Sequence, residues 1–290
     1  MADQAYPEFQ RVTRTPSEQA PVGAWDCQVH VFGDFNKYPV RPGAKYPPPS
    51  AHIEDMRRMH QTLGIARGVM VQATPHGMDH SLLLDLLAEE KRYIGAAIID
   101  DDTSDRELQR LHDGGFRSAR FNFASFLGMS PNAKTFQRSI ARISEMGWVA
   151  KIHAVGSEYL EIADLLRPLE LPTVIDHMGH FYFKDGMDQP VIPLLLELLR
   201  KENVWIMLSN ADRRSATGAP YDDAIPFARM FIEAAEDRCI WGTDWPHTHY
   251  AGVMPNDADL LELFHRFAPD PKLRQRILVD NPERLWGKLR

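Results

Sequence analysis

Four ionisable residues follow short apolar runs in this sequence and have the types needed for acid–base chemistry. His30, His153 and His177 stand at the ends of three such runs, and Asp244 follows a fourth in the segment G-T-D-W-P-H. A carboxylate can accept a proton from a reactant, and an imidazole can donate or accept one near neutral pH. A single histidine in such a place is usually structural. Three histidines and an aspartate predict a catalytic site, provided that the fold brings them together.

Arg120 is unusual because it lies inside an apolar run, F-R-S-A-R-F-N. A guanidinium buried in such a run needs an anionic partner. That partner is either a carboxylate of the protein or a carboxylate of the substrate, and we favour the substrate. Asp176 precedes His177 in I-D-H-M-G. It is interpreted as a structural carboxylate, because neighbouring residues of a strand point to opposite faces.

Further polar residues are expected to contact the substrate: Gln28, Tyr46, Asn122, Arg213 and Arg214. Gln28 and Asn122 stand at the ends of apolar runs. Arg213 and Arg214 follow the run N-V-W-I-M-L-S, and at least one of them is expected to face the site. Tyr46, in K-Y-P-P-P, suits a packing role about as well as a ligand contact.

The elements that must position these residues alternate along the chain. Strands are predicted at 24–31, 67–73, 93–99, 116–122, 148–154, 172–176, 203–209 and 238–242. Helical spacing occurs at 51–63, 78–91, 104–113, 133–146, 157–168, 190–201, 221–235 and 257–267. The strands are continuous apolar runs, which is typical of a parallel sheet buried on both faces.

This alternation predicts an α/β fold, a single-domain (β/α)8 TIM barrel, whose active site lies at the carboxyl ends of the strands. A doubly wound sheet is the alternative, but no glycine-rich phosphate-binding fingerprint follows any strand. Residues 1–22 are interpreted as an N-terminal arm and residues 23–290 as the barrel. The proline-rich loop 32–50 is expected to form a lid or a pocket wall.

Composition narrows the function classes. The chain has 290 residues and a formal net charge of −7, which disfavours binding to nucleic acid. No apolar run approaches twenty residues, so no membrane span is predicted, and the N-terminus has no apolar signal region. The two cysteines, Cys27 and Cys239, lie in apolar runs and are interpreted as reduced core thiols of a cytoplasmic protein. The sequence leaves open a monomer or a homo-oligomer.

Several motifs taken in order resemble the amidohydrolase superfamily. They are D-C-Q-V-H-V-F-G, R-F-N, D-H-M-G, W-G-T-D-W-P-H and N-P-E-R-L-W-G, which together extend over roughly residues 22–290. More narrowly, they resemble the branch of 2-pyrone-4,6-dicarboxylate lactonase and the aldarolactone isomerases. This resemblance implies a (β/α)8 barrel and a reaction at a lactone carbonyl. It carries functional roles onto His30, Arg120, His177 and Asp244.

Two positions depart from the patterns of these relatives. The superfamily's usual first-strand motif is H-x-H, which ligates a metal, whereas this chain has Gln28-Val29-His30. A carboxamide is a poor zinc ligand, and the lactonase branch works without a metal, so we expect no metal and no other cofactor. The lactonases that this chain resembles have the pattern R-F-N-F-x-x-R, whose second arginine serves a second substrate carboxylate. This chain has Phe126 at that position. A less acidic or differently shaped lactone is therefore expected.

The expected reaction is hydrolysis of a carboxylated lactone, a small-molecule substrate from the breakdown of aromatic compounds or of sugar acids. Asp244 would take a proton from water, and His30 and His177 would donate hydrogen bonds to the carbonyl oxygen. His153 would be a second donor or shape the wall, and Arg120 with Arg213 or Arg214 would clamp the carboxylate. The phenylalanines near the expected mouth suit a flat unsaturated ring, which favours aromatic breakdown.

Four alternatives stay open. An isomerase would use the same groups, with a substrate hydroxyl in place of water. A zinc hydrolase would use His30, His153, His177 and Asp244 as ligands. A decarboxylase of the same superfamily also needs an acid and a carboxylate clamp. A barrel that only binds small acids would have no use for an aspartate among three histidines.

Overall fold

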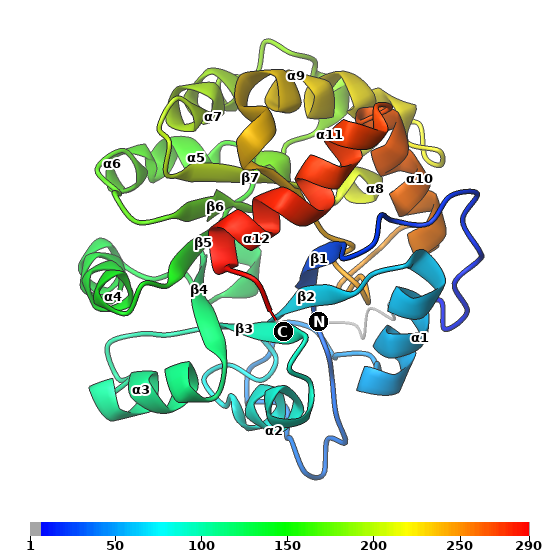
Figure 1. The fold of residues 1–290 in the computed structure, drawn as a ribbon. Helices are drawn as coiled ribbons and strands as arrows, with labels where there is room; N and C mark the ends of the chain where they lie inside the picture. Colours follow the sequence, from blue (N-terminus) through cyan, green and yellow to red (C-terminus); the bar gives the residue numbers. More distant parts are fainter. Residues whose placement is uncertain (1–6, 290) are drawn as a thin grey trace.

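The computed structural model describes residues 7–289. Eight parallel strands form one sheet in the order β1 to β8, with each strand paired to the next along the chain, as the predicted barrel requires. Their bounds are β1 (Trp25–Val29), β2 (Arg67–Val71), β3 (Tyr93–Ala97), β4 (Phe116–Asn122), β5 (Val149–His153), β6 (Thr173–Ile175), β7 (Val204–Leu208) and β8 (Cys239–Trp241). The helices surround this sheet, as Figure 1 shows.

The backbone of the predicted site closes the barrel between β8 and β1. Val29 bridges to Trp245, which follows β8. The amide of Asp244 donates to the carbonyl of Gln28 at 2.9 Å, and the amide of His30 donates to the carbonyl of Trp245 at 2.8 Å. The positions of His30 and Asp244 are therefore fixed by the same hydrogen bonds that join the two ends of the sheet.

Asp26 supports this closure from inside the protein. Its carboxylate is wholly buried and accepts hydrogen bonds from the amide and the hydroxyl of Thr243, two residues beyond β8. Gly242 lies between the end of β8 and Thr243, and a Cβ on it would stand 2.8 Å from the backbone nitrogen of Gln28. The close approach of the two strands therefore requires glycine at this position.

The main helices agree closely with the helical spacing. They are α1 (Ile53–Leu63), α2 (Ser81–Glu89), α3 (Asp105–Asp113), α4 (Ala133–Glu145), α7 (Val191–Leu199), α9 (Ile225–Ala235) and α10 (Asp257–Phe267). Ser104 caps α3 by accepting from the amide of Glu107, and Gly64 ends α1 with a φ of 82°. The expected helix 157–168 is instead two short helices, α5 (Glu158–Glu161) and α6 (Ala163–Leu166), which meet at the non-helical Ile162.

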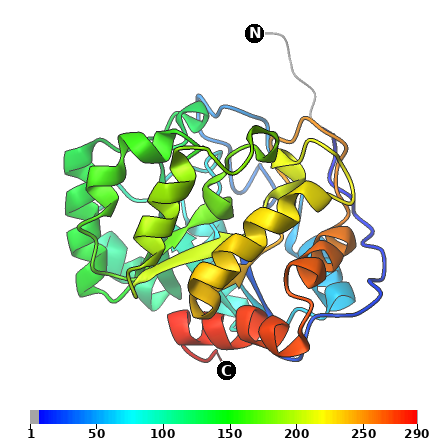
Figure 2. The same cartoon turned by 90° about the horizontal axis from the view of Figure 1, so that it is seen from above.

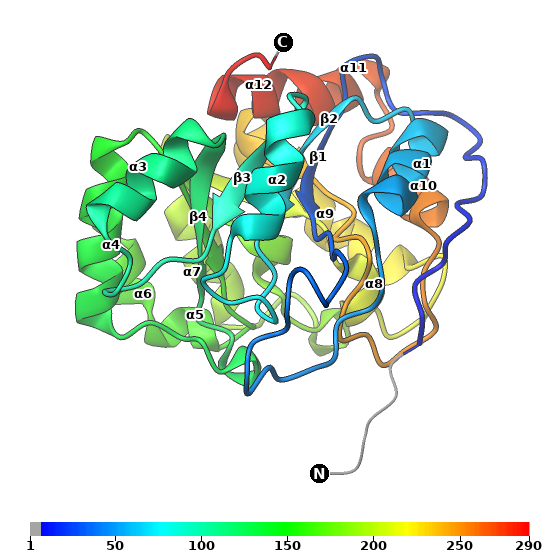
Figure 3. The ribbon, with the colours of Figure 1, turned by 90° about the horizontal axis from the view of Figure 1, so that it is seen from below.

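Three short helices were not expected from the sequence. They are α8 (Ala211–Arg214), α11 (Pro271–Gln275) and α12 (Asn281–Trp286). Trp286 of α12 stacks on Trp25 at 6.0 Å between ring centroids and donates to the Ser118 hydroxyl at 2.9 Å. Figures 2 and 3 show α12 across one end of the barrel, and in Figure 3 the loop after β1 lies at the opposite end. The end where the strands begin is thus covered, and the other end is left for the site.

Three further expectations concern the cysteines, the length of the helices and the loop after β1. Cys27 and Cys239 are both buried free thiols, as predicted. Within residues 7–289, no helix is long and apolar enough to cross a membrane. Loop 32–50 contributes Tyr46 to the wall of a cavity, which supports its expected role as a pocket wall.

Candidate active site

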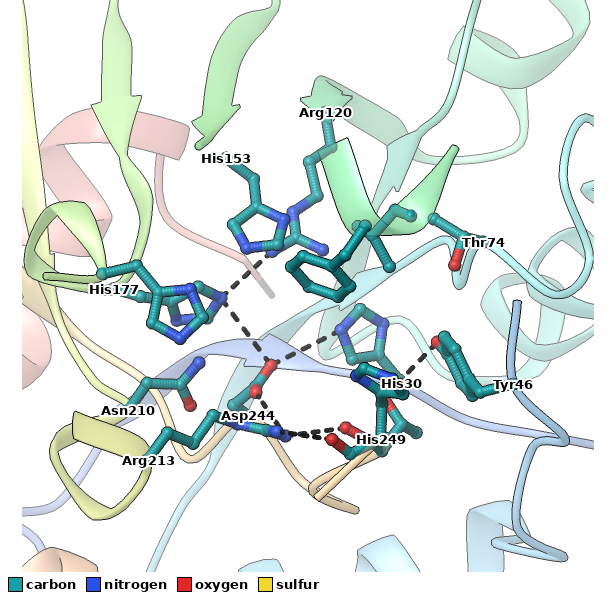
Figure 4. Close-up of a pocket in the computed structure, with 14 residues that line it drawn as sticks. His30, Tyr46, Thr74, Arg120, His153, His177, Asn210, Arg213, Asp244 and His249 are labelled. Atoms are coloured by element: carbon teal, nitrogen blue, oxygen red, sulfur yellow. Dashed lines mark hydrogen bonds and ion pairs between the residues drawn. The ribbon is translucent and has the colours of Figure 1, made fainter. Parts of the chain in front are cut away.

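A cavity of about 50 Å³, here called the inner cavity, lies at the carboxyl ends of the strands. Figure 4 shows its labelled side chains converging from separate strands and loops. Seven predicted site residues line it: His30, Tyr46, Arg120, His153, His177, Arg213 and Asp244. Six further lining residues were not predicted from the sequence: Thr74, Leu127, His180, Asn210, Thr248 and His249. Phe126, which marked the departure from the lactonases, completes the wall.

Asp244 lies at the centre of the polar contacts in Figure 4. Its Oδ1 is 3.5 Å from Nε2 of His30 and 3.9 Å from Nε2 of His177, and its Oδ2 is 3.4 Å from Nη2 of Arg213. Burial alone would raise the pKa of this carboxyl, but the contact with His30 and the Arg213 guanidinium hold it well below the ordinary value. Asp244 is therefore a carboxylate at neutral pH.

His30 carries a proton on Nδ1, on the side away from the cavity. Its Nδ1 lies 2.8 Å from the Val71 carbonyl, which can only accept, so Nδ1 must donate. Its Nε2 lies 3.2 Å from the side-chain nitrogen of Gln28 and 3.5 Å from Oδ1 of Asp244. The expected donation from His30 to a substrate carbonyl concerns this Nε2 and stays a prediction. Gln28 is fully buried behind His30 and does not line the inner cavity.

His177 has the same proton arrangement for a different reason. Nη2 of Arg120 donates to its Nε2 at 3.0 Å, so the proton is on Nδ1, which donates to the Ser209 hydroxyl at 2.8 Å. Burial lowers the pKa of His177 to about 3, so the ring is neutral. The expected carbonyl donation from His177 is therefore corrected, because Arg120 already occupies the lone pair of Nε2.

The anionic partner of Arg120 is Asp176. Nε of Arg120 donates to Oδ2 of Asp176 at 2.8 Å, and Nζ of Lys151 lies 3.0 Å from Oδ1. Burial would raise the pKa of Asp176, but Lys151 and Arg120 together lower it. This geometry corrects our preference for a substrate carboxylate and supports the structural interpretation of Asp176. Since two cations share one carboxylate, Arg120 still presents positive charge to the inner cavity.

His153 and His180 complete the imidazole group. Nδ1 of His153 donates to Oδ1 of Asn122 at 3.3 Å, so Asn122 lies behind His153 and outside the inner cavity. Burial and Arg120 keep the pKa of His153 well below its ordinary value. His180 is also buried, and neither of its ring nitrogens has a hydrogen-bond partner among the described residues. Its N–H is therefore available to a ligand.

Left-handed backbone recurs around the inner cavity. Five of its lining residues have positive φ: His177 (57°), His180 (54°), Asn210 (59°), Asp244 (62°) and His249 (58°). For residues with a Cβ, this conformation costs about 1–2 kcal/mol each. Such strain concentrates at functional sites, where the surrounding structure imposes it. The protein therefore retains these side chains at positions where their backbone conformation is unfavourable.

The two adjacent arginines point to different places. Arg213 lines the inner cavity, and besides Asp244 its guanidinium donates to the Thr248 carbonyl at 2.9 Å and the His249 carbonyl at 3.4 Å. Arg214 does not line the inner cavity. It lines a second cavity of about 440 Å³, here called the outer cavity. The expectation that at least one of the pair faces the site is met by Arg213.

Comparison with known proteins agrees with this architecture. Residues 25–288 match the amidohydrolase family. The chain is 38% identical over 273 residues to a 4-sulfomuconolactone hydrolase of Hydrogenophaga intermedia, covering 93% of this chain and 90% of that protein. It is 37% identical to a 2-pyrone-4,6-dicarboxylate hydrolase of Comamonas testosteroni, with 93% and 92% covered. It is 32% identical to a D-galactarolactone isomerase of Agrobacterium fabrum, with 93% of each chain covered. This chain therefore belongs to the amidohydrolase family.

Proposed function

We propose that this protein hydrolyses a lactone that carries an anionic substituent, and that Asp244 activates the attacking water. The observation that carries the proposal is the buried Asp244 carboxylate, held ionised at the centre of the inner cavity. Two relatives of 37% and 38% identity are hydrolases named for anionic lactones, which supports the lactonase class expected from the sequence. The substrate is thus a small molecule that bears negative charge.

The proposed reaction begins with a water molecule beside Asp244. The carboxylate takes one proton as the water oxygen attacks the lactone carbonyl carbon, which produces a tetrahedral oxyanion. When the ring carbon–oxygen bond breaks, Asp244 returns the proton to the departing ring oxygen. The product is a hydroxy acid, or the keto form of an enol, and the net change is the addition of one water.

The oxyanion needs a donor other than His177, whose Nε2 already accepts from Arg120. Arg120 is the strongest candidate because its Nη2 and Oδ1 of Asp244 contact the same atom, Nε2 of His177. Its guanidinium is therefore close to where the carbonyl must lie. The Tyr46 hydroxyl also faces the inner cavity, and burial raises its pKa, so it keeps its proton. One donor of this kind contributes about 3–4 kcal/mol to the transition state.

Zinc does not fit the donor set of this cavity. Within residues 7–289, no group of three or more histidine, cysteine or acidic side chains has the arrangement of a metal site. Zinc would have to bind about 2.0–2.1 Å from Nε2 of His177. That lone pair already accepts from the Arg120 guanidinium, so two cations would face each other. We therefore propose catalysis without a metal.

The isomerase remains a second candidate because of the galactarolactone isomerase relative. The two reactions differ in the source of the attacking oxygen. In water labelled with oxygen-18, hydrolysis places the label in the new carboxylate, whereas attack by a substrate hydroxyl does not. Label found in the product separates a hydrolase from an isomerase on the same substrate.

A direct test uses enzyme dialysed against chelator and a panel of lactones with and without anionic substituents. We expect ring opening of at least one anionic lactone, and no change on adding zinc. The Asp244→Asn protein serves as the matched control. Loss of activity on chelation with recovery by zinc would overturn the metal-free mechanism, and no turnover anywhere on the panel would overturn the function.

A further inference from the structure

The outer cavity adjoins the inner cavity. Four residues line both: Phe126, His180, Arg213 and His249. The rings of Phe126 and His249 stack at 5.3 Å with an interplanar angle of 9°. The boundary between the cavities is therefore formed by side chains. The inner cavity has a volume of about 50 Å³ and the outer cavity one of about 440 Å³, so the outer cavity has more room for a substituent of a ring that binds in the inner cavity.

Arg214 gives the outer cavity a cation that makes no close ion pair. Within residues 7–289 no carboxylate oxygen lies within 4.0 Å of its guanidinium, Glu158 acts on it from farther away, and its buried Nε has no hydrogen-bond partner. Its guanidinium lies 4.5 Å from the centre of the Tyr182 ring, which holds it in place. Its neighbour Arg213 differs, because Asp244 and two backbone carbonyls already occupy its terminal nitrogens, Nη1 and Nη2.

His180 adds a buried donor to the same cavity. The residue is 5% exposed, lines both cavities, and has no hydrogen-bond partner at either ring nitrogen among the described residues. Burial, with Arg214 beside it, keeps the pKa of His180 well below its ordinary value, so the ring is a neutral donor. Asp212 also lines the outer cavity, and burial raises the pKa of its carboxyl, which favours the neutral form.

We propose that the outer cavity is the subsite for the anionic arm of the lactone, with Arg214 as its charge partner and His180 as a hydrogen-bond donor. The ligand is an oxyanion on a substituent of the ring, either a carboxylate or a sulfonate. The inference rests on the proposed lactone hydrolysis and places its specificity outside the inner cavity. It also gives a role to Phe126, which stands where the lactonases that this chain resembles have an arginine. In this proposal the anion binds in the outer cavity, beside the Phe126 ring, instead of at that position.

The test compares a lactone that carries a carboxylate arm with its neutral methyl ester. In wild type we expect kcat/KM to favour the acid, and in Arg214→Met this preference should fall about tenfold, the scale of a charge-assisted contact at a partly buried site. Lys184→Met is the matched control, because Nζ of Lys184 lies over the same Tyr182 ring at 5.3 Å but outside both cavities. A sulfonate analogue shows which oxyanion is preferred.

Binding in the Asp244→Asn background separates this subsite from the chemistry. Calorimetry should show tighter binding of the acid than of the ester, and Arg214→Met should remove the difference. Equal loss for acid and ester in Arg214→Met, or the same loss in Lys184→Met, would overturn the subsite. If wild type opens no lactone but the binding preference depends on Arg214, the proposed function fails and the subsite stands.

Discussion

Nε2 of His177 accepts a hydrogen bond from Nη2 of Arg120 across 3.0 Å. Because a guanidinium can only donate, this contact keeps the His177 proton on Nδ1. Asp176 fixes the other side of Arg120, so the guanidinium is held between a carboxylate and an imidazole. One geometric relationship therefore changes the expected roles of both residues. His177 orients Arg120, and Arg120 provides the positive charge beside Asp244.

The first prediction follows from that relationship. Arg120→Met should lower kcat for the acid lactone and for its methyl ester alike, because the lost charge acts on the carbonyl. His177→Asn should cost much less in the Arg120→Met background than in wild type, with a coupling of about 0.5–3 kcal/mol. Steady-state kinetics of the single and double variants measure this. A loss confined to the acid would restore Arg120 as a carboxylate clamp.

The second prediction concerns the base. Asp244→Asn keeps the shape of the side chain but cannot accept a proton, so the turnover number should fall about 100-fold or more. Substrate should still bind, as calorimetry can check. Circular dichroism controls for folding, since the amide of Asp244 also helps to close the barrel. A folded variant within about threefold of wild type would place the base elsewhere, with His153 as the next candidate.

The pH profile gives a third prediction. Asp244 is active as the carboxylate, and its pKa lies well below 3.8. Activity should therefore be retained as pH falls from 8 to 5, because the base gains a proton only under more acidic conditions. His177 stays neutral over the same range, with a pKa of about 3. An acid limb in kcat/KM near pH 6–7 would indicate an imidazole base instead.

Phe126 supplies a fourth prediction, about specificity. Its side chain is 41% exposed and packs on His249, so replacement should be tolerated. Phe126→Arg restores the R-F-N-F-x-x-R pattern and places a cation on the boundary of the two cavities. We expect kcat/KM for 2-pyrone-4,6-dicarboxylate to rise about tenfold by a charge-assisted contact. Phe126→Met, which removes the ring without adding charge, is the control, and an equal change in both variants would contradict the prediction.

The fifth prediction concerns stability and uses a histidine outside the site. His80 is buried, its Nε2 accepts from the Ile98 amide, and burial lowers its pKa to about 4. Below pH 6.5 the unfolded chain binds a proton at His80 that the folded protein does not bind. The free energy of unfolding therefore decreases as the pH decreases. The slope approaches about 1.4 kcal/mol per pH unit from this group until the pH reaches the folded value.

His80→Gln should therefore flatten the acid side of the stability curve by about that slope. Urea unfolding at pH 4.5, 5.0, 5.5, 7.5 and 8.5 provides the measurement. Between pH 7.5 and 8.5 the wild-type and variant curves should run parallel, which is the internal control for the cost of the substitution itself. Parallel curves down to pH 4.5 would mean that His80 is already protonated in the folded protein.

The barrel could be predicted from local patterns because each strand is a continuous apolar run. β4 covers residues 116–122 and α10 covers residues 257–267, as predicted. The helices α8, α11 and α12 were missed because four to six residues give too few turns for a helical period. Their positions depend on tertiary contacts, such as that between Trp286 and Trp25.

The strand-borne part of the site was predictable for the same reason, and the loop-borne part was not. His30, Arg120 and His153 were found because they lie on or beside strands, whereas His180 and His249 lie in loops without a periodic signal. Lys151 did offer a signal, since a lysine inside an apolar strand needs an anion, and that anion is Asp176. The proton positions depend on distant partners, such as the Val71 carbonyl for His30, which no local pattern contains.

Phe9 packs edge-on against Trp245, with 5.2 Å between the ring centroids. Trp245 directly follows Asp244, so a residue of the N-terminal arm touches the backbone neighbour of the proposed base. The cavity linings contain no residue of this arm. Substitutions at Phe9 are therefore expected to reach Asp244 through Trp245, from outside both cavities.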